Sequence, residues 1–82
     1  MVHGHVQGVF FRDTTRRQAT ARDVSGWVRN NPDGTVEAVF EGEPDAVDAM
    51  VRFAHDGPRG AVVERVDVTE EGPEGLSGFR FA

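Results

Sequence analysis

Two glycines and an arginine near the start of the chain have the spacing of an anion-binding loop. Gly4 and Gly8 stand four residues apart, and Arg12 follows where a polar run compatible with a helix begins. Glycine accepts a positive φ and allows close approach of other groups, so such a loop can turn several backbone N–H groups inward. Those donors, the positive end of a following helix and a guanidinium together suit a phosphate. A tight glycine turn beside a surface arginine explains the same residues, so the spacing alone leaves both interpretations open.

Length and composition describe a small acidic domain. The chain has 82 residues, which suits one domain spanning residues 1–82, and its formal net charge is −5. It has no cysteine, which excludes disulfides, thiolate catalysis and cysteine-ligated metals. The negative balance disfavours nucleic acid as a partner. No apolar signal segment opens the chain and no run reaches membrane-spanning length, so we expect a cytoplasmic protein with no membrane partner.

The first half of the chain reads as a helix followed by a hairpin. A helix is predicted over residues 13–23, on a narrow face formed by Phe11, Thr15 and Ala19. Residues 24–31 alternate as a strand, with Trp27 on the face opposite the small apolar residues. The Asn-Pro-Asp-Gly sequence at 31–34 is a strong turn signal, and residues 35–41 alternate again. We therefore predict a β-hairpin after the first helix.

The second half predicts a second helix and two more strands. The helix begins at Pro44 and ends at Gly57-Pro58, and its apolar stripe is Val47, Met50, Val51 and Ala54. A strand over residues 62–69 should place Val62, Val66 and Val68 on one face, and a short strand should follow at 79–81. If a strand precedes Gly4, the order is βαββαβ plus one strand. This is an α+β plan with two helices on one face of an antiparallel sheet.

Two long motifs in these elements resemble the signatures of the acylphosphatases. The first reads Val-x-Gly-x-Val-Gln-Gly-Val-x-Phe-Arg over residues 2–12. The second reads Gly-Trp-Val-Arg-Asn over residues 26–30 and continues through Asp-Gly-Thr-Val-Glu at 33–37 and Phe-Glu-Gly at 40–42. Order and separation match the family, and the resemblance covers essentially the whole chain. Two such motifs are far more specific than the paired glycines alone.

The resemblance implies a ferredoxin-like sandwich whose mostly antiparallel sheet has four to five strands, ordered 4-1-3-2-5. It also implies hydrolysis of the carboxyl–phosphate bond of small-molecule acyl phosphates, with no metal and no other cofactor. Carried over by residue, the catalytic pair is Arg12 and Asn30. The phosphate cradle is the backbone of six residues: His5, Val6, Gln7, Gly8, Val9 and Phe10. Asn31 falls where the family varies, so it receives no role. A non-catalytic ferredoxin-like module that binds a phosphorylated ligand or a partner protein is the alternative.

The chemistry fits so small a set of residues. A carboxylate leaves easily, since its acid has a pKa of about 4, and a loose phosphoryl-transfer transition state asks mainly for positioning and charge stabilisation. Arg12 can grip two phosphoryl oxygens, and loop N–H groups can take the others. The carboxamide of Asn30 can accept a hydrogen bond from water and orient it for attack. These roles predict that an enzyme needs both residues, whereas an anion binder needs only the arginine.

The chain departs from the family pattern in two places. His5 stands where the family commonly has an arginine, so the pH dependence of activity should differ while the backbone cradle survives. Only three residues precede Gly4, although the first strand of this fold lies inside the sheet. A stub there would leave groups on neighbouring strands unpaired. A chain that starts too late, a strand supplied by a partner chain, or a sheet rearranged around the stub would each explain it. A monomer is expected unless a partner completes that strand.

The remaining candidate residues have simpler interpretations. His3 and His5 could form a weak metal pair, but without a third ligand we interpret them as surface residues. His55 should cap the second helix, where a cation is favoured. Trp27 and Phe40 could form a stacking platform for RNA bases, but the acidic balance favours packing in the core.

Overall fold

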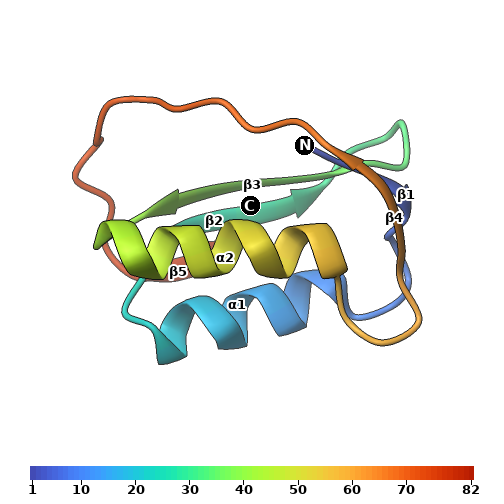
Figure 1. Cartoon of the computed structure of the whole chain (residues 1–82), viewed down its shortest axis with the longest axis horizontal. Coiled ribbons are helices and arrows are strands. Elements are labelled where there is room, and N and C mark those ends of the chain that lie inside the picture. The colour runs from blue at the N-terminus through green and yellow to red at the C-terminus, as the bar shows by residue number, and fades with distance from the viewer.

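The computed structural model describes residues 1–82, and it confirms the predicted α+β plan. The elements are β1 (Val2–His5), α1 (Phe11–Ala21), β2 (Ser25–Asn30), β3 (Val36–Glu41), α2 (Pro44–Asp56), β4 (Val62–Val66) and β5 (Phe79–Phe81). One five-stranded sheet has the order β4-β1-β3-β2-β5, as the family resemblance implied. Only the β2–β5 pair is parallel. Both helices lie side by side against one face of this sheet (Figure 1).

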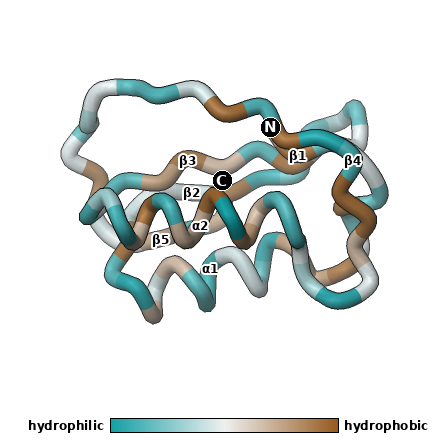
Figure 2. The backbone as a smooth tube through the Cα atoms, viewed as in Figure 1, coloured by the Kyte–Doolittle hydropathy of each residue, from teal (hydrophilic) through white to brown (hydrophobic).

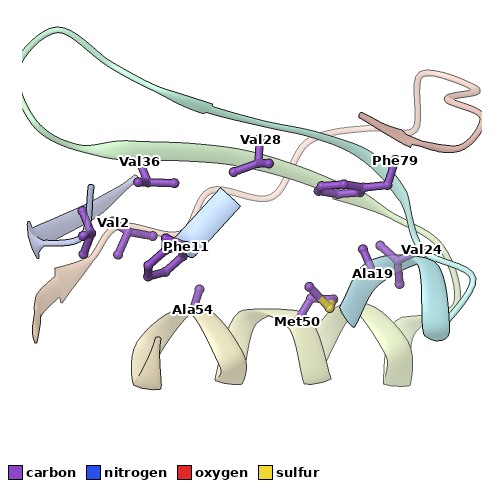
Figure 3. Close-up of a cluster of buried hydrophobic side chains, with 10 residues drawn as sticks. Val2, Phe11, Ala19, Val24, Val28, Val36, Met50, Ala54 and Phe79 are labelled. Atoms are coloured by element: carbon purple, nitrogen blue, oxygen red, sulfur yellow. The ribbon is translucent and has the colours of Figure 1, made fainter. Parts of the chain in front are cut away.

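The core lies between the sheet and the two helices. Valines of the strands meet Phe11 and Ala19 of α1 and Met50 and Ala54 of α2, as Figure 3 shows. The face predicted for α1 is confirmed, because Phe11, Thr15 and Ala19 are all buried. Thr15 satisfies its buried hydroxyl by donating to the Phe11 carbonyl oxygen at 2.7 Å.

The predicted hairpin is confirmed in its turn and its register. β2 and β3 pair antiparallel from Ser25↔Glu41 to Asn30↔Val36. Asp33 shapes the turn because its carboxylate accepts hydrogen bonds from the Thr35 N–H at 3.0 Å and from the Thr35 hydroxyl at 2.6 Å. The hairpin therefore holds the end of β2, where Asn30 lies, in a defined position.

The stripe predicted for α2 is rotated relative to the observed one. Met50 and Ala54 are buried as expected, but Ala46 and Phe53 pack on the core in place of Val47 and Val51. Phe53 is drawn inward by the Phe11 ring of α1, with the two ring centroids 5.9 Å apart. The contact between helices thus decides the rotation, which a hydropathy pattern alone does not specify. Figure 2 shows the alternating hydrophobic and hydrophilic positions along this helix.

The strand predicted over 62–69 is wrong in its length and in its faces. β4 ends at Val66, and Val63 and Val66 pack on the core while Val62 and Val68 are exposed. A bulge causes the change: the register with β1 shifts between His3 and Gly4, so two inward residues of β4 stand three apart. The segment after β4 crosses above β3 as a mostly hydrophilic coil (Figure 2).

The first strand is short, as predicted, but the sheet keeps its order around it. All four residues of β1 pair with β4, whereas Val2↔Val36 is the only pairing with β3. Met1 extends the pairing of β1 with the β4 segment by one more hydrogen bond, which the Asp67 N–H donates to the Met1 carbonyl oxygen at 2.9 Å. The idea of a sheet rearranged around the stub is therefore wrong.

Two further expectations, for Trp27 and for His55, need correction. Trp27 does not join the core. It is half-buried on the opposite face of the sheet, with the Arg29 guanidinium 5.1 Å from its ring centroid. His55 does not cap the last carbonyls of α2, because its Nδ1 lies 2.9 Å from the Val51 carbonyl oxygen inside the helix. Neither helix is long and apolar enough to cross a bilayer.

Candidate active site

The strand directions bring three segments to one edge of the sheet. β1 and β2 both run antiparallel to β3, and β5 runs parallel to β2, so these three strands end at the same edge. The loop after β1, Asn30 at the end of β2 and Phe81 at the end of β5 therefore lie near one another. The amino end of α1 starts from the same loop (Figure 1).

A cleft of about 560 Å³ opens at this edge. Its lining residues come from the loop after β1, the first turn of α1 and the ends of β2 and β5: Val6, Gly8, Phe10, Phe11, Arg12, Asp13, Asn30 and Phe81. The structure thus brings Arg12 and Asn30, predicted as a pair from positions 18 residues apart in the sequence, to one cleft. Half of the lining is polar or glycine and half is apolar, which suits a ligand with one charged part and one apolar part.

The loop of residues 6–10 turns through two left-handed backbone positions. Gly8 has φ +74° and Phe10 has φ +59°, and Phe10 is the residue that precedes the first turn of α1. No backbone N–H from Val6 to Asp13 donates to another group of the protein, and no side chain caps the helix. The first such bond of the helix is donated by Thr14 to the Phe10 carbonyl at 3.0 Å. A continuous run of backbone N–H groups from Val6 to Asp13 is therefore unpaired and available to a ligand.

Arg12 is exposed and forms no ion pair. Its guanidinium carbon lies 5.6 Å from the Phe81 ring centroid, and the guanidinium carbon of Arg16, one helical turn later, lies 5.5 Å from the same ring. Asp13 also lines the cleft, but Arg17 neutralises it, with Nε donating to the carboxylate at 2.9 Å. The free charge in the cleft is therefore the positive charge of Arg12.

Asn30 points toward the side of the sheet that α1 covers. It follows the buried Gly26 and Val28 at alternate positions of β2, and it is exposed with no side-chain hydrogen bond. The neighbouring Asn31 has a structural part instead: its side-chain amide donates to the Thr35 hydroxyl at 3.0 Å. The free carboxamide at this place is thus the one of Asn30.

The side chain of Gln7 ties the loop to the hairpin. Its amide nitrogen donates to the Asn31 carbonyl at 2.8 Å and to the Thr35 carbonyl at 3.0 Å. These bonds fix the distance between the loop and the end of β2, which carries Asn30. Sequence reasoning gave Gln7 only a backbone role, although a glutamine beside Gly8 is a possible signal of such a tie.

Some residues predicted for the cradle do not line the cleft. Val6, Gly8 and Phe10 do, whereas His5 is exposed at the end of β1, Gln7 points to the hairpin and Val9 packs against the core. Gly4 is not part of the loop either. It lies in β1 with φ +131°, where a Cβ would come 2.1 Å from the Val62 carbonyl oxygen. Its role is close contact with β4 at the bulge.

Sequence reasoning missed Phe81 as a residue of the site. The sequence showed only a short final strand, and the parallel pairing Val28↔Phe81 is what places this ring beside Arg12. Nothing in the local sequence of residues 79–81 signals that pairing.

The shifted carboxyl groups lie around the hairpin and β1, outside the cleft. Hydrogen bonds from Thr35 lower the pKa of Asp33, and a hydrogen bond from Arg29 lowers the pKa of Glu37. His3 Nε2, 2.9 Å from Asp67 Oδ2, lowers the pKa of Asp67. His3 and His5 do not belong to any group of three His, Asp or Glu side chains close enough to hold a metal.

The fold and the cleft define a small α+β domain with a loop of unpaired N–H groups beside a free guanidinium, and comparison with known proteins gives its family. The family model described as acylphosphatase matches residues 1–81. An acylphosphatase of Rubrobacter xylanophilus is 64% identical over 74 residues, which span 90% of this chain and 67% of that protein. An acylphosphatase of Thermococcus kodakarensis is 56% identical over 79 residues, spanning 96% and 87% of the two chains.

The solved structures agree. An acylphosphatase structure from Coxiella burnetii superposes with a TM-score of 0.94 at 40% identity, covering 99% of this chain and 85% of that one. The chain belongs to the acylphosphatase family, so the resemblance seen in its two motifs is confirmed. Members of this family are hydrolases, and their function is the hydrolysis of acyl phosphates.

Proposed function

We propose that the cleft hydrolyses acyl phosphates with Arg12 and Asn30 as its catalytic residues and with the backbone of residues 5–10 as its phosphate cradle. The observation that carries the proposal is the meeting of a free guanidinium, a free carboxamide and a run of free N–H groups in one cleft. An anion-binding module has no use for the carboxamide, so this set favours an enzyme.

Phosphate recognition rests on two kinds of donor. The unbonded N–H groups of the loop and of the first turn of α1 can surround the phosphoryl oxygens, and the helix end adds a partial positive charge. The guanidinium of Arg12 can bind two oxygens at once, since no carboxylate competes for it. Stacking on Phe81 limits the directions that this guanidinium can take, which reduces the entropy lost on binding.

The reaction follows from where these groups stand. A water that donates a hydrogen bond to the Asn30 carboxamide oxygen is oriented toward phosphorus, and it attacks as the bond from phosphorus to the acyl oxygen breaks. The electron pair leaves with the carboxylate, and the water proton passes to solvent or to a phosphoryl oxygen, giving inorganic phosphate. Arg12 and the N–H groups stabilise charge on the equatorial oxygens. The carboxylate is stable without protonation, so no general acid is needed.

The test is hydrolysis of benzoyl phosphate in the presence of EDTA. Arg12→Ala should lower kcat/KM by about 10²- to 10³-fold, as removal of one charge-stabilising donor does in other enzymes. Arg12→Lys should recover little, because an ammonium cannot reproduce the bidentate fork. Asn30→Ala should lower kcat and leave KM nearly unchanged.

The matched control is Arg80→Ala. Arg80 is an exposed arginine adjacent to Phe81 in β5, and it lies on the other face of the sheet beside Trp27. This variant changes net charge as Arg12→Ala does, and it should retain full activity. If Asn30→Ala raised KM with kcat unchanged, the assigned role of Asn30 would be wrong. Phosphate binding without any hydrolysis by the wild type would favour the non-catalytic module.

The cellular setting belongs to the same proposal. We propose that the chain acts as a monomer in the cytoplasm, on small-molecule acyl phosphates, without a metal and without nucleic acid. A net charge of −5 supports the exclusion of nucleic acid. Sedimentation equilibrium would test the monomer, and full activity in EDTA would test the absence of a metal requirement.

A further inference from the structure

Two aromatic rings beside the proposed phosphate site are exposed in the structure. Phe10 is 78% exposed and Phe81 is 46% exposed, and both line the cleft that holds Arg12 and Asn30. Phosphate recognition uses N–H groups and the guanidinium of Arg12, which the Phe81 ring supports, so it leaves the Phe10 ring without a function in that step. Exposed apolar side chains gathered in one cleft indicate a binding surface for an apolar group.

The conformation of Phe10 strengthens this argument. Its backbone is left-handed, with φ 59° and ψ 26°, a region that is unfavourable for a bulky residue and that glycine or asparagine adopts easily. Phe10 also occupies the N-cap position of α1, where it provides no side-chain hydrogen bond and where Asn, Asp or Ser would provide one. Its ring is outside the core cluster. The Phe10 side chain therefore contributes little to folding, although its backbone is strained. Strain that folding does not explain indicates a functional role, here contact with a ligand.

We propose that Phe10 and Phe81 form an acyl-binding rim, and that it gives the enzyme a preference for aromatic acyl phosphates over acetyl phosphate. This inference rests on the proposed function. With the phosphoryl group held by Arg12 and the loop, the acyl group extends from the same cleft past the two rings. An aromatic acyl group can stack on Phe10, because offset or edge-to-face contacts between rings are favourable. A cleft of about 560 Å³ has room for both parts of such a substrate.

Phe10 is the sharper probe of the two residues. Phe81 also supports the guanidiniums of Arg12 and Arg16, so its removal would disturb phosphate binding as well. The Phe10 ring stacks on no other aromatic ring and on no arginine side chain of the chain. Its ring can be removed without opening a cavity in the core.

The experiment compares kcat/KM for benzoyl phosphate with kcat/KM for acetyl phosphate, and uses their ratio as the readout. Differences in leaving-group strength cancel when the ratio of a variant is divided by the wild-type ratio. Phe10→Ala should lower the ratio about tenfold, the loss expected when roughly one ring-to-ring contact is removed. Phe10→Tyr should retain the wild-type ratio. Val68→Ala removes an apolar side chain that is 57% exposed outside the cleft, and it should leave the ratio unchanged.

A second variant separates folding from recognition. Phe10→Gly should raise the melting temperature, since glycine relieves the left-handed strain, while it lowers the substrate ratio as Phe10→Ala does. If the wild type hydrolyses both substrates but Phe10→Ala and Phe10→Gly keep its ratio, the acyl-binding rim is wrong and the proposed function stands. If the wild type hydrolyses neither substrate, both proposals fail.

Discussion

Gln7 should couple catalysis to folding, because its side chain joins the loop of residues 6–10 to the hairpin that carries Asn30. Gln7→Leu removes two hydrogen bonds, to the carbonyl oxygens of Asn31 and Thr35. Neither carbonyl oxygen is left without a donor. The Gly34 N–H still donates to the Asn31 carbonyl oxygen at 3.1 Å, and the Asn31 N–H still donates to the Thr35 carbonyl oxygen at 2.9 Å. The penalty for orphaned acceptors is therefore avoided, and the free energy of unfolding should fall by about 1 to 2 kcal/mol.

The effect on catalysis should be larger than this loss of stability suggests. Without the tie, the loop and Asn30 can move apart, and small displacements of positioned groups are costly to rate. We expect kcat for benzoyl phosphate to fall by about tenfold in Gln7→Leu, an order-of-magnitude figure for a sub-ångström shift. Gln7→Glu should be worse at neutral pH, since its carboxylate would face two carbonyl oxygens with no proton to donate.

The assays are urea denaturation for stability and initial rates for kcat, both at neutral pH. Gln18→Leu is the matched control, because Gln18 lies on α1 and its side-chain oxygen accepts only from Arg22, one turn along the helix. That variant should change the unfolding free energy by less than about 0.5 kcal/mol and should leave kcat unchanged. Wild-type values of both quantities in Gln7→Leu would show that the loop is held by its backbone alone and would refute the reasoning.

Three further predictions concern the scaffold. Gly26→Ala should prevent folding, because a Cβ there would come 1.8 Å from the Val39 carbonyl oxygen. Gly34→Ala has open space around it, so it should lower the free energy of unfolding by only about 1 kcal/mol. Circular dichroism and urea midpoints would distinguish the two variants. Met50→Ala should cost about 2 to 5 kcal/mol in urea unfolding, since Met50 is fully buried. The lowered pKa values of Asp33, Glu37 and Asp67 mean that their stabilising contribution is present above the ordinary carboxyl pKa of about 4 and is lost as pH falls through the lower folded values. The urea midpoint should therefore decline from pH 5 to pH 3, and less steeply in Asp33→Asn; an equal decline in that variant would contradict the assignment.

Local features of the fold could be predicted from the sequence because local chemistry determines them. The turn around Asp33 depends on residues within two positions of it, and the face of α1 follows from a repeat of one residue every four. The rotation of α2 and the inward residues of β4 could not be predicted in this way. The first depends on the contact between Phe53 and Phe11, and the second on a bulge opposite Gly4, so both are set by partners distant in the sequence.

The residues of the site also differ in whether local sequence or distant pairing places them. The meeting of Arg12, Asn30 and the loop at one cleft could be predicted, because each lies in one of the two sequence motifs. Phe81 and the side chain of Gln7 could not, since their roles arise from the β2–β5 pairing and from the fold of the hairpin back onto the loop. Strand order therefore decides which residues surround the proposed catalytic pair, and the surrounding residues are the ones that should set substrate preference.

The charge distribution explains how an acidic protein can bind a substrate that is itself negative. Carboxylates hold Arg17, Arg29 and Arg65 in ion pairs, whereas Arg12 and Arg16 share the ring of Phe81 and have no acidic partner. A ring stabilises a cation without cancelling its charge, so the cleft keeps a local positive field within a chain of net charge −5. A long polyanion would meet the acidic surface beyond the cleft, but a small acyl phosphate needs only the cleft itself. The same composition that disfavours nucleic acid is therefore compatible with rapid binding of a small anion.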